Sequence, residues 1–411
     1  ALVDIVQTKD DSATVHLGSG DLNSAFGDTT QLVLSRPTEA GLMRQIAPRL
    51  TDNRFAFADI LGDSFVDIVE IEDGLMHVYD GKADGTFPYL GRSIPLPGIS
   101  PTTFAGGNGR FADVNMDSMS DIVTTRLNAD GRTEWRIFLN LTRRQADGGY
   151  NVNFGALTKA FPFNSQDGQI LGRNNVRMVD INGDRLPDLV VIRPADQGFC
   201  LYENQGNIFS TDPNALLFGD AAINDPVCGH GTFSKIGGMQ PGDNLATMWY
   251  IDANGDGIID FASMGERTDQ IRIWLGFGDG TYLKDPLSIA LNLRVQLGTS
   301  TQTFASRVAD IDGDGESEII VFQKPSGDEV KPVVIIDFNR TATMQLVKAN
   351  LLTVVDFDSG RRHDIRYATS IDEMLRDRAN GQPTRNLHFP VVVAKQLVTS
   401  QGIPGQVRAQ V

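Results

Sequence analysis

The sequence is poor in cysteine and histidine, has no long apolar run and carries an excess of negative charge. Its 411 residues include two cysteines, too few for a disulfide framework, and five histidines that stand singly rather than at metal-ligand spacings. No apolar stretch reaches the roughly 18 residues of a transmembrane helix, so we expect no membrane insertion by this chain. With 36 basic against 52 acidic residues, the net charge is −16, which argues against nucleic-acid binding.

Other absences exclude further functions. The sequence contains no H-E-x-x-H, G-x-S-x-G or P-loop motif, and we therefore predict that it is not an enzyme. Cys200 and Cys228 could form one bridge in an oxidising compartment. Two buried free thiols is the preferred interpretation, because free cysteine is among the most buried residue types.

A repeated acidic pattern dominates what is present. Nine residues with acids at positions one, five and nine, and usually Asp or Asn at position three, precede a β-branched run. Complete copies occupy 59–67, 113–121, 180–188, 252–260 and 310–318. Residues 1–6 match the second half of a sixth copy, so we expect the natural protein to extend N-terminally.

The spacing of the copies predicts the fold. Their last acids recur every 54 to 72 residues, and each interval carries a second alternating strand and a Gly-rich hairpin. Such a period of short strands and turns is typical of propeller blades. The sequence therefore predicts an all-β fold, with a β-propeller of about six four-stranded blades, N-terminally truncated, over residues 1–345.

The pattern changes from about residue 346. Segments 351–357 and 363–367 predict two strands joined at 358–360, a capping box predicts a short helix over 371–378, and 389–394 predicts another strand. Residues 346–411 are too few for a domain of their own. We expect them to begin a further β-rich domain.

The acidic loops are candidate calcium sites. Alternate residues of a tight loop turn their oxygens the same way, a carbonyl at position seven adds a ligand, and calcium accepts six or more oxygens. The candidate ligands are Asp252, Asn254, Asp256, Ile258, Asp260, Asp310, Asp312, Asp314, Glu316, Glu318, Asp180, Asn182, Asp184, Leu186, Asp188, Asp113, Asn115, Asp117 and Asp121, with Ile258, Glu316 and Leu186 at position seven.

The alternative is that the Asp and Asn side chains only form Asx turns with their own backbone. Calcium is the preferred interpretation for 252–260, 310–318 and 180–188, whereas the two interpretations stand level for 113–121. In 59–67, Leu61 replaces a ligand, and Asx turns are preferred.

The repeats resemble the FG-GAP/VCBS repeats of integrin-like propellers. The tail is more specific: Tyr367–Ser370, Leu375–Thr384 and Leu387–Val391 look like the segment that follows the propeller in B components of bacterial toxin complexes (Tc toxins) and in related virulence-plasmid-B and RHS proteins. The sequence departs from that pattern in having Thr384 where Trp follows the proline and His388 where Pro is usual.

The resemblance implies a secreted or cell-surface bacterial toxin component. Its propeller would be mounted on the hollow RHS shell of its own parent chain, dock onto the channel-forming A component and control toxin passage. The irregular insertion 203–248, with Phe209, Phe218 and Met239, is the expected special feature of this propeller.

The alternative is an extracellular calcium-dependent adhesion or glycan-binding propeller. A lectin would repeat one aromatic pocket in every blade. Trp135, Tyr79, Tyr202 and Trp274 are expected at related positions but differ in kind, which argues against repeated sugar sites.

Overall fold

The computed structural model describes most of the chain. The described residues are 5–9, 12–18, 26–38, 41–49, 53–82, 85–104, 107–127, 133–160, 171, 175–207, 218–220, 222–239, 248–264, 270–290, 304–311, 317–323, 333–338, 352–357, 360–369, 376–377, 380 and 392–401.

Within these residues the acidic repeat builds six antiparallel sheets. They are, in chain order, β1 (Ile5–Lys9), β2 (Ser12–Gly18) and β3 (Phe26–Gln31); β6 (Phe55–Ala58), β7 (Asp67–Glu72), β8 (Leu75–Tyr79) and β9 (Tyr89–Pro95); β10 (Gly109–Ala112), β11 (Asp121–Leu127), β12 (Thr133–Asn140) and β15 (Phe154–Ala160); β16 (Val176–Val179), β17 (Asp188–Arg193), β18 (Gly198–Tyr202) and β19 (Thr232–Lys235); β20 (Met248–Ile251), β21 (Asp260–Met264), β22 (Gln270–Trp274) and β23 (Leu287–Ala290); and β24 (Phe304–Ala309), β25 (Glu318–Gln323) and β26 (Val333–Ile336).

Smaller elements connect or follow these sheets. A hairpin of β4 (Leu34–Pro37) and β5 (Met43–Ile46) lies between the first two sheets in the sequence, and β13 (Arg143–Arg144) pairs with β14 (Tyr150–Asn151). The helical pieces are α1 (Pro101–Phe104) and the 3₁₀ turn η4 (Pro194–Asp196). The last sheet contains β27 (Val354–Asp356), β28 (Arg361–Thr369) and β29 (Val392–Gln401).

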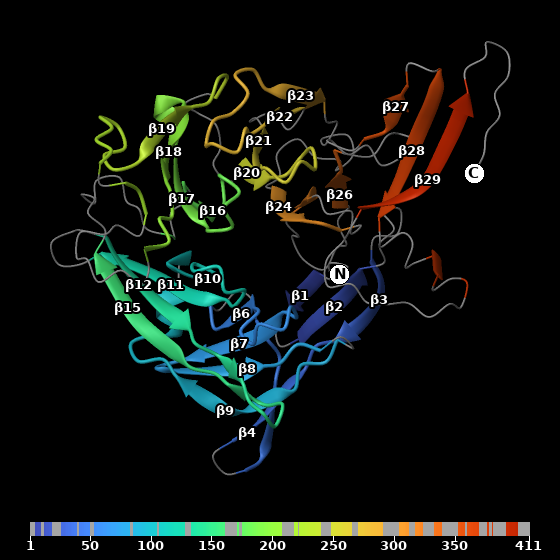
Figure 1. Cartoon of the computed structure of the whole chain (residues 1–411). Coiled ribbons are helices and arrows are strands. Elements are labelled where there is room, and N and C mark those ends of the chain that lie inside the picture. Colours follow the sequence, from blue (N-terminus) through green and yellow to red (C-terminus); the bar gives the residue numbers. More distant parts are fainter. Residues whose placement is uncertain are drawn as a thin grey trace.

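The six sheets follow one another around a common centre (Figure 1). In the four-stranded sheets the first strand lies nearest the centre and the last strand lies outermost, as β6 and β9 or β16 and β19 show. The sheet β27–β29 lies outside this arrangement. The expectation of an all-β fold is confirmed, and four of the six sheets have the predicted four strands.

The core forms where neighbouring sheets face each other. The apolar or β-branched run after each acid becomes the second strand of its sheet. This strand is covered on both faces: β7 and β17 are buried over five consecutive residues. The apolar clusters join adjacent sheets: Val123 and Trp135 pack with Val176, and Phe199 packs in one cluster with Trp274. Burial of such side chains is the main favourable contribution to folding.

Two expectations about buried residues need correction. Tyr79, Tyr202 and Trp274 pair with the residue after the acid, but the equivalent residue of the third sheet is Phe138 and not Trp135, which lies three residues earlier on β12. Phe218 and Met239 of the 203–248 insertion are fully buried, so they belong to the core and not to a surface; Phe209 lies outside the described residues.

The prediction of two free thiols is wrong. Cys200 of β18 and Cys228 are joined in a disulfide, and both are almost fully buried. The chain folds back over 28 residues and returns to the edge of the same sheet, where Thr232 begins β19. The number of residues between two cysteines does not show whether the chain returns to the same place, so the sequence could not reveal that Cys200 and Cys228 meet.

In the tail, the predicted hairpin is confirmed: β27 and β28 pair, and Gly360 lies in the turn between them. The following strand is β29, which begins at Val392. Of the predicted helix 371–378, only Arg376 and Asp377 are described, and both are helical. The rest of that segment, like 381–391, lies outside the described residues.

Candidate functional site

Each acidic loop connects the first strand of its sheet to the second. The loops 59–67, 113–121, 180–188 and 252–260 are described completely, and each ends at the acid that begins the next strand. We call this position-nine residue the loop-closing acid. The set comprises Asp67, Asp121, Asp188, Asp260 and Glu318, and each is at most 2% exposed.

The loop-closing acid ties its loop to the end of the third strand of the same sheet or to the residues just after it. In the fifth sheet, Asp260 accepts a hydrogen bond from the Ala253 N–H at Oδ2 (2.9 Å) and one from the Gly276 N–H at Oδ1 (2.8 Å). The same two bonds recur from Ile60 and Gly81 to Asp67, from Val114 and Asn140 to Asp121, and from Ile181 and Asn204 to Asp188. Glu318 accepts the equivalent loop bond from Ile311 at 2.7 Å.

Two of the residues that donate to a loop-closing acid also reach the preceding sheet. The Asn140 side chain donates to the Ile60 carbonyl (2.9 Å), and the Asn204 side chain donates to the Val114 carbonyl (3.3 Å). The equivalent residues of the second and fifth sheets are Gly81 and Gly276, which have no side chain to form such a bond. The loop ends of the second, third and fourth sheets are therefore linked in series.

Burial changes the acidity of the loop-closing acids. Loss of hydration raises the pKa of Asp67 and Asp121 to about 7 and that of Asp188 and Asp260 to about 6, against a usual 3.8. The backbone N–H bonds act in the opposite direction but are the smaller effect. Neighbouring acids of the same loop raise the pKa further.

These raised values predict that the metal-free protein becomes less stable as pH rises from about 4 to about 7. In that window the folded acids hold protons that the unfolded chain has released, so the free energy of unfolding falls with increasing pH. We expect a higher melting temperature at pH 5 than at pH 8, measured by circular dichroism with a chelator present. An equal or higher melting temperature at pH 8 would contradict these pKa values.

The remaining loop side chains bind their own backbone. Asp252 accepts from the Gly255 N–H (2.7 Å) and the Gly257 N–H (2.9 Å), and Asp256 accepts from the Ile258 N–H (2.8 Å). The Asn254 amide donates to Asp256 (3.1 Å), as Asn115 and Asn182 do to Asp117 and Asp184. These bonds are the Asx turns of the alternative interpretation, and position three supplies the hydrogen-bond donor.

The predicted metal ligands are thus brought together only in part. Asp252, Asn254 and Asp256 share one half-buried loop and still face solvent, whereas Asp260 turns inward. Among the described residues, no three acidic side chains are arranged to hold a metal ion. Asp310 and Glu318 are described, but Asp312, Asp314 and Glu316 lie outside the described residues. Calcium binding stays a prediction.

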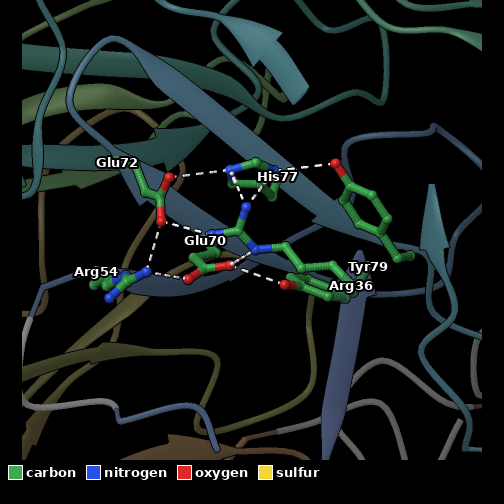
Figure 2. A network of polar contacts seen from close by, with 7 residues as sticks. Arg36, Arg54, Glu70, Glu72, His77 and Tyr79 are labelled. Carbon is green, nitrogen blue, oxygen red and sulfur yellow. Dashed lines mark hydrogen bonds and ion pairs between the residues drawn. The ribbon is translucent and has the colours of Figure 1, made fainter. Parts of the chain in front are cut away.

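Sequence reasoning missed a polar network at the β4–β5 hairpin, which Figure 2 shows. Arg36 of β4 contacts Glu70 of β7 through Nε (3.1 Å) and Glu72 through Nη2 (2.6 Å). Arg54, which precedes β6, contacts the same two glutamates. Glu70 is fully buried and also accepts from the Tyr79 hydroxyl at 2.8 Å.

His77 completes the network as a neutral side chain. Its Nε2 lies 2.9 Å from an Arg36 nitrogen and 3.3 Å from a Glu72 oxygen, and its Nδ1 lies 3.1 Å from the Tyr89 hydroxyl. Burial and the charge of Arg36 lower the pKa of His77, so the ring stays uncharged at neutral pH. We call these residues, Arg36, Arg54, Glu70, Glu72, His77, Tyr79 and Tyr89, the polar network.

The polar network distinguishes the contact between the β4–β5 hairpin and the sheet β6–β9 from the equivalent positions of the other sheets. At the register of Glu70, three residues after the loop-closing acid, the other sheets have Thr124, Val191, Ser263 and Val321. Attraction between buried charges barely exceeds the cost of desolvating them, so this contact adds less net stability than an apolar one. The sequence signal was present, because Glu70 and Glu72 interrupt an otherwise apolar strand.

The hairpin held by this network also carries exposed apolar side chains. Leu42 is 71% exposed, and Met43 and the preceding Val33 are more than half exposed. Arg44 lies beside them and is exposed too. In the described part of the chain, no helix has the length and apolar character that crossing a bilayer requires.

Taken together, the acidic loops, the sheets set around a centre and the buried ties define a repetitive all-β protein. Comparison with known families agrees with the resemblance inferred from the tail. Residues 283–410 match the family model described as "Insecticide toxin TcdB middle/N-terminal region". The chain is therefore similar to the B components of Tc toxins.

Comparison with solved structures concerns the fold alone. The Photorhabdus luminescens Tc holotoxin pore is similar over 98% of this chain and 16% of its own, with 18% identity and a TM-score of 0.59, which shows a shared fold. A TcdB2–TccC3 structure is less similar, with 16% identity and a TM-score of 0.43 over 98% of this chain and 20% of its own. An Agrocybe aegerita N-acetylglucosamine lectin has 18% identity and a TM-score of 0.44 over 82% of this chain and 91% of its own. No curated protein sequence matches. The chain spans about a fifth or less of the toxin chains.

Proposed function

We propose that this chain is the non-catalytic docking and gating propeller of a secreted toxin-complex B-like protein. It would bind the channel-forming A component and control the passage of a toxin held in the RHS shell of the parent chain. The observation that carries the proposal is the match of residues 283–410 to the TcdB family, joined to a shared fold over nearly the whole chain.

In this proposal residues 1–345 form the propeller and residues 346–411 begin the shell domain. The position of β27–β29 outside the six sheets supports that division. Gating requires one boundary that can open. Our candidate for that role is the boundary between the β4–β5 hairpin and the sheet β6–β9. It combines the ionic contacts of the polar network with the apolar packing of Leu34 and Ile46, and Leu42 of the hairpin is exposed.

Binding of the 411-residue chain to a channel-forming A component, measured by biolayer interferometry, tests the proposal. We expect saturable binding by the wild type. Replacing Glu70 by glutamine weakens the polar network and should change the association rate, because opening becomes easier. Glu134→Gln, at a partly exposed ion pair with Arg126, is the matched control.

The outcomes separate docking from gating. No binding at micromolar concentrations would exclude the docking function. Binding with equal rates for the wild type, Glu70→Gln and Glu134→Gln would leave docking in place and exclude the polar network as the gate.

No observation favours the glycan-binding alternative. All three tryptophans are buried: Trp135 and Trp274 are fully enclosed, and Trp249 is 8% exposed. Tyr79 and Tyr202 are buried as well. Sugar-binding sites need an accessible aromatic face, which none of these residues offers.

We also propose that calcium stabilises the acidic loops. Asp252, Asn254 and Asp256 present oxygens at a solvent-facing loop, and calcium would relieve the repulsion between its acids. The loop 310–318 has an Asp at position three, which cannot donate to position five as Asn254 does. It therefore has the greatest need of a cation.

Chelator is accordingly expected to lower the melting temperature by several degrees, and added calcium to restore it. Differential scanning calorimetry measures both shifts. In Asp312→Asn, the new amide can donate a hydrogen bond to position five and so takes over the stabilising role of the cation. We therefore expect a smaller chelator effect. If the melting temperature is the same with chelator and with calcium, the loops are hydrogen-bonded turns alone.

A further inference from the structure

The fold places two Asn–Gly pairs inside acidic loops. An asparagine followed by glycine is prone to lose its side-chain amide, because no side chain shields the backbone nitrogen that attacks it. The sequence has four such pairs, at 108–109, 182–183, 254–255 and 380–381. Asn182 and Asn254 hold position three of their loops, whereas Asn108 directly precedes β10. Gly381 lies outside the described residues.

In both loops a carboxylate contacts the backbone N–H that follows the asparagine. Asp252 Oδ1 accepts a hydrogen bond from the Gly255 N–H at 2.7 Å. In the loop of the fourth sheet, Asp180 Oδ1 accepts from the Gly183 N–H at 2.8 Å. A carboxylate at that distance can take the proton while the nitrogen attacks, which is the role of a general base.

The side-chain carbonyl of the asparagine is polarised by another backbone N–H. Asn254 Oδ1 accepts from the Asp256 N–H at 3.0 Å, and Asn182 Oδ1 accepts from the Asp184 N–H at 3.1 Å. A donor at that place stabilises the negative charge that develops on the oxygen when the carbonyl carbon is attacked. Because Oδ1 is bonded to the residue beyond Gly255, the Asn254 side chain is folded over the Gly255 nitrogen.

Asn115 has the same loop position but a different neighbour. Its Oδ1 also accepts from the N–H at position five, that of Asp117, at 3.3 Å. The residue that follows it is Met116, whose side chain shields the nitrogen. Asp113 accepts instead from the N–H groups of Asn115, Asp117 and Ser118. This loop therefore has the polarised carbonyl without the glycine and its base.

Asn108 has the glycine but a different environment. Gly109 is the buried first residue of β10, where it lies opposite Thr124 and against the Phe104 ring. The pair precedes a strand and belongs to none of the acidic loops. The four asparagines thus separate the effect of the glycine from that of the loop.

We propose that Asn182 and Asn254 are sites of self-catalysed deamidation. The glycine nitrogen forms a bond to Cγ of the asparagine side chain, and its proton passes to the carboxylate at position one. The Cγ–Nδ2 bond then breaks, and the side-chain nitrogen leaves with that proton as ammonia. The product is a cyclic imide, which water opens to aspartate or isoaspartate without any change of oxidation state.

The conversion would change how the loop is held together. Asn254 would lose the amide that donates to Asp256 at 3.1 Å, and the loop would gain a negative charge. Its composition would then match that of 310–318, which has Asp312 at position three. A loop closed by its own hydrogen bonds would become one with an excess of carboxylates. This inference rests on neither the docking function nor bound calcium.

Peptide mass spectrometry measures the conversion at each asparagine. The chain is incubated in chelator at mildly alkaline pH, so that no cation occupies the carboxylates at position one, and is digested at intervals. We expect Asn182 and Asn254 to convert at least about tenfold faster than Asn108, because only the loops supply a positioned base. Asn115 should convert as slowly as Asn108. In urea, Asn108 should convert as fast as the two loop asparagines.

A variant of the proposed base tests its role. Asp252→Asn cannot take the proton but keeps an oxygen that can accept the Gly255 N–H. It should slow the conversion of Asn254 about tenfold or more. Asn182 of the same molecule, whose base is Asp180, should convert at the wild-type rate and is the matched control.

A second variant should create the reaction where it is absent. Met116→Gly gives the third sheet's loop an unshielded nitrogen, and the φ of 62° at this position is one that glycine adopts without strain. Asn115 should then convert about tenfold faster than in the wild type, because the methionine side chain no longer blocks the attack.

Three results would overturn the proposal. The first is equal conversion of Asn108 and Asn254 in the folded chain, because the Asn–Gly pair alone would then set the rate. The second is an unchanged rate at Asn254 in Asp252→Asn, and the third is no conversion at either loop asparagine. If Asp252→Asn fails to fold by circular dichroism, Met116→Gly decides, and a wild-type rate at Asn115 would then overturn the proposal.

Discussion

Replacement of Asp260 by alanine is expected to lower the free energy of unfolding by about 3 kcal/mol, because two buried backbone N–H groups lose their acceptor. These are the Ala253 and Gly276 N–H groups, which lie 2.9 and 2.8 Å from the carboxylate. Removing a buried charge recovers part of the loss. Urea unfolding in chelator measures the change without any contribution from bound metal.

The matched control is Asp279→Ala. Asp279 also accepts a backbone N–H, from Thr281 at 2.9 Å, but it lies in an exposed turn where water replaces the lost bond. We expect a change below about 1 kcal/mol there. Asp260→Asn should lower the free energy of unfolding by an amount between those of the two alanine variants, because the NH₂ of its amide must face one of the two backbone N–H donors. If Asp260→Ala and Asp279→Ala unfold at the same urea concentration, the loop-closing acid is not a structural tie.

Loss of the disulfide between Cys200 and Cys228 is expected to lower the free energy of unfolding by about 3 to 4 kcal/mol, from the entropy of closing a loop of this length. The bridge closes 28 residues. Both sulfurs are buried, so reductant should act on the unfolded chain and lower the unfolding midpoint. Urea unfolding with and without reductant measures the difference.

A variant with both cysteines changed to serine is the control. With or without reductant, it should unfold at the urea midpoint of the reduced wild type, because the chain has only these two cysteines. An oxidised wild type that unfolds together with the double variant would show that the bridge adds no stability.

The sheets were predictable because their signals are local. An acid followed by apolar or β-branched residues marks the start of β7, β11, β17, β21 and β25, and the Gly-rich segments mark the turns that follow. The all-β class followed directly. Trp135 was misplaced because its strand, β12, is longer than its counterparts, so its position relative to Phe138 could not be counted from sequence alone.

The candidate site was predictable only in part. The loop pattern located Asp252, Asn254 and Asp256, but it did not separate them from Asp260, whose two oxygens are taken by N–H groups. The polar network depends on Arg36, which reaches Glu70 from a different segment. A contact between segments so far apart in sequence has no periodic signal.

The side-chain bonds of Asn140 and Asn204 have a mechanical consequence. They join the sheets that begin with β6, β10 and β16 at their loop ends, so these three sheets resist separation as one stiff arc. Gly81 provides no such bond on the side of the arc that faces the β4–β5 hairpin, where the ionic contacts of Arg36 and the apolar packing of Leu34 and Ile46 hold the hairpin. A load on the hairpin would therefore be relieved at that single boundary, and the arc behind it would keep its shape.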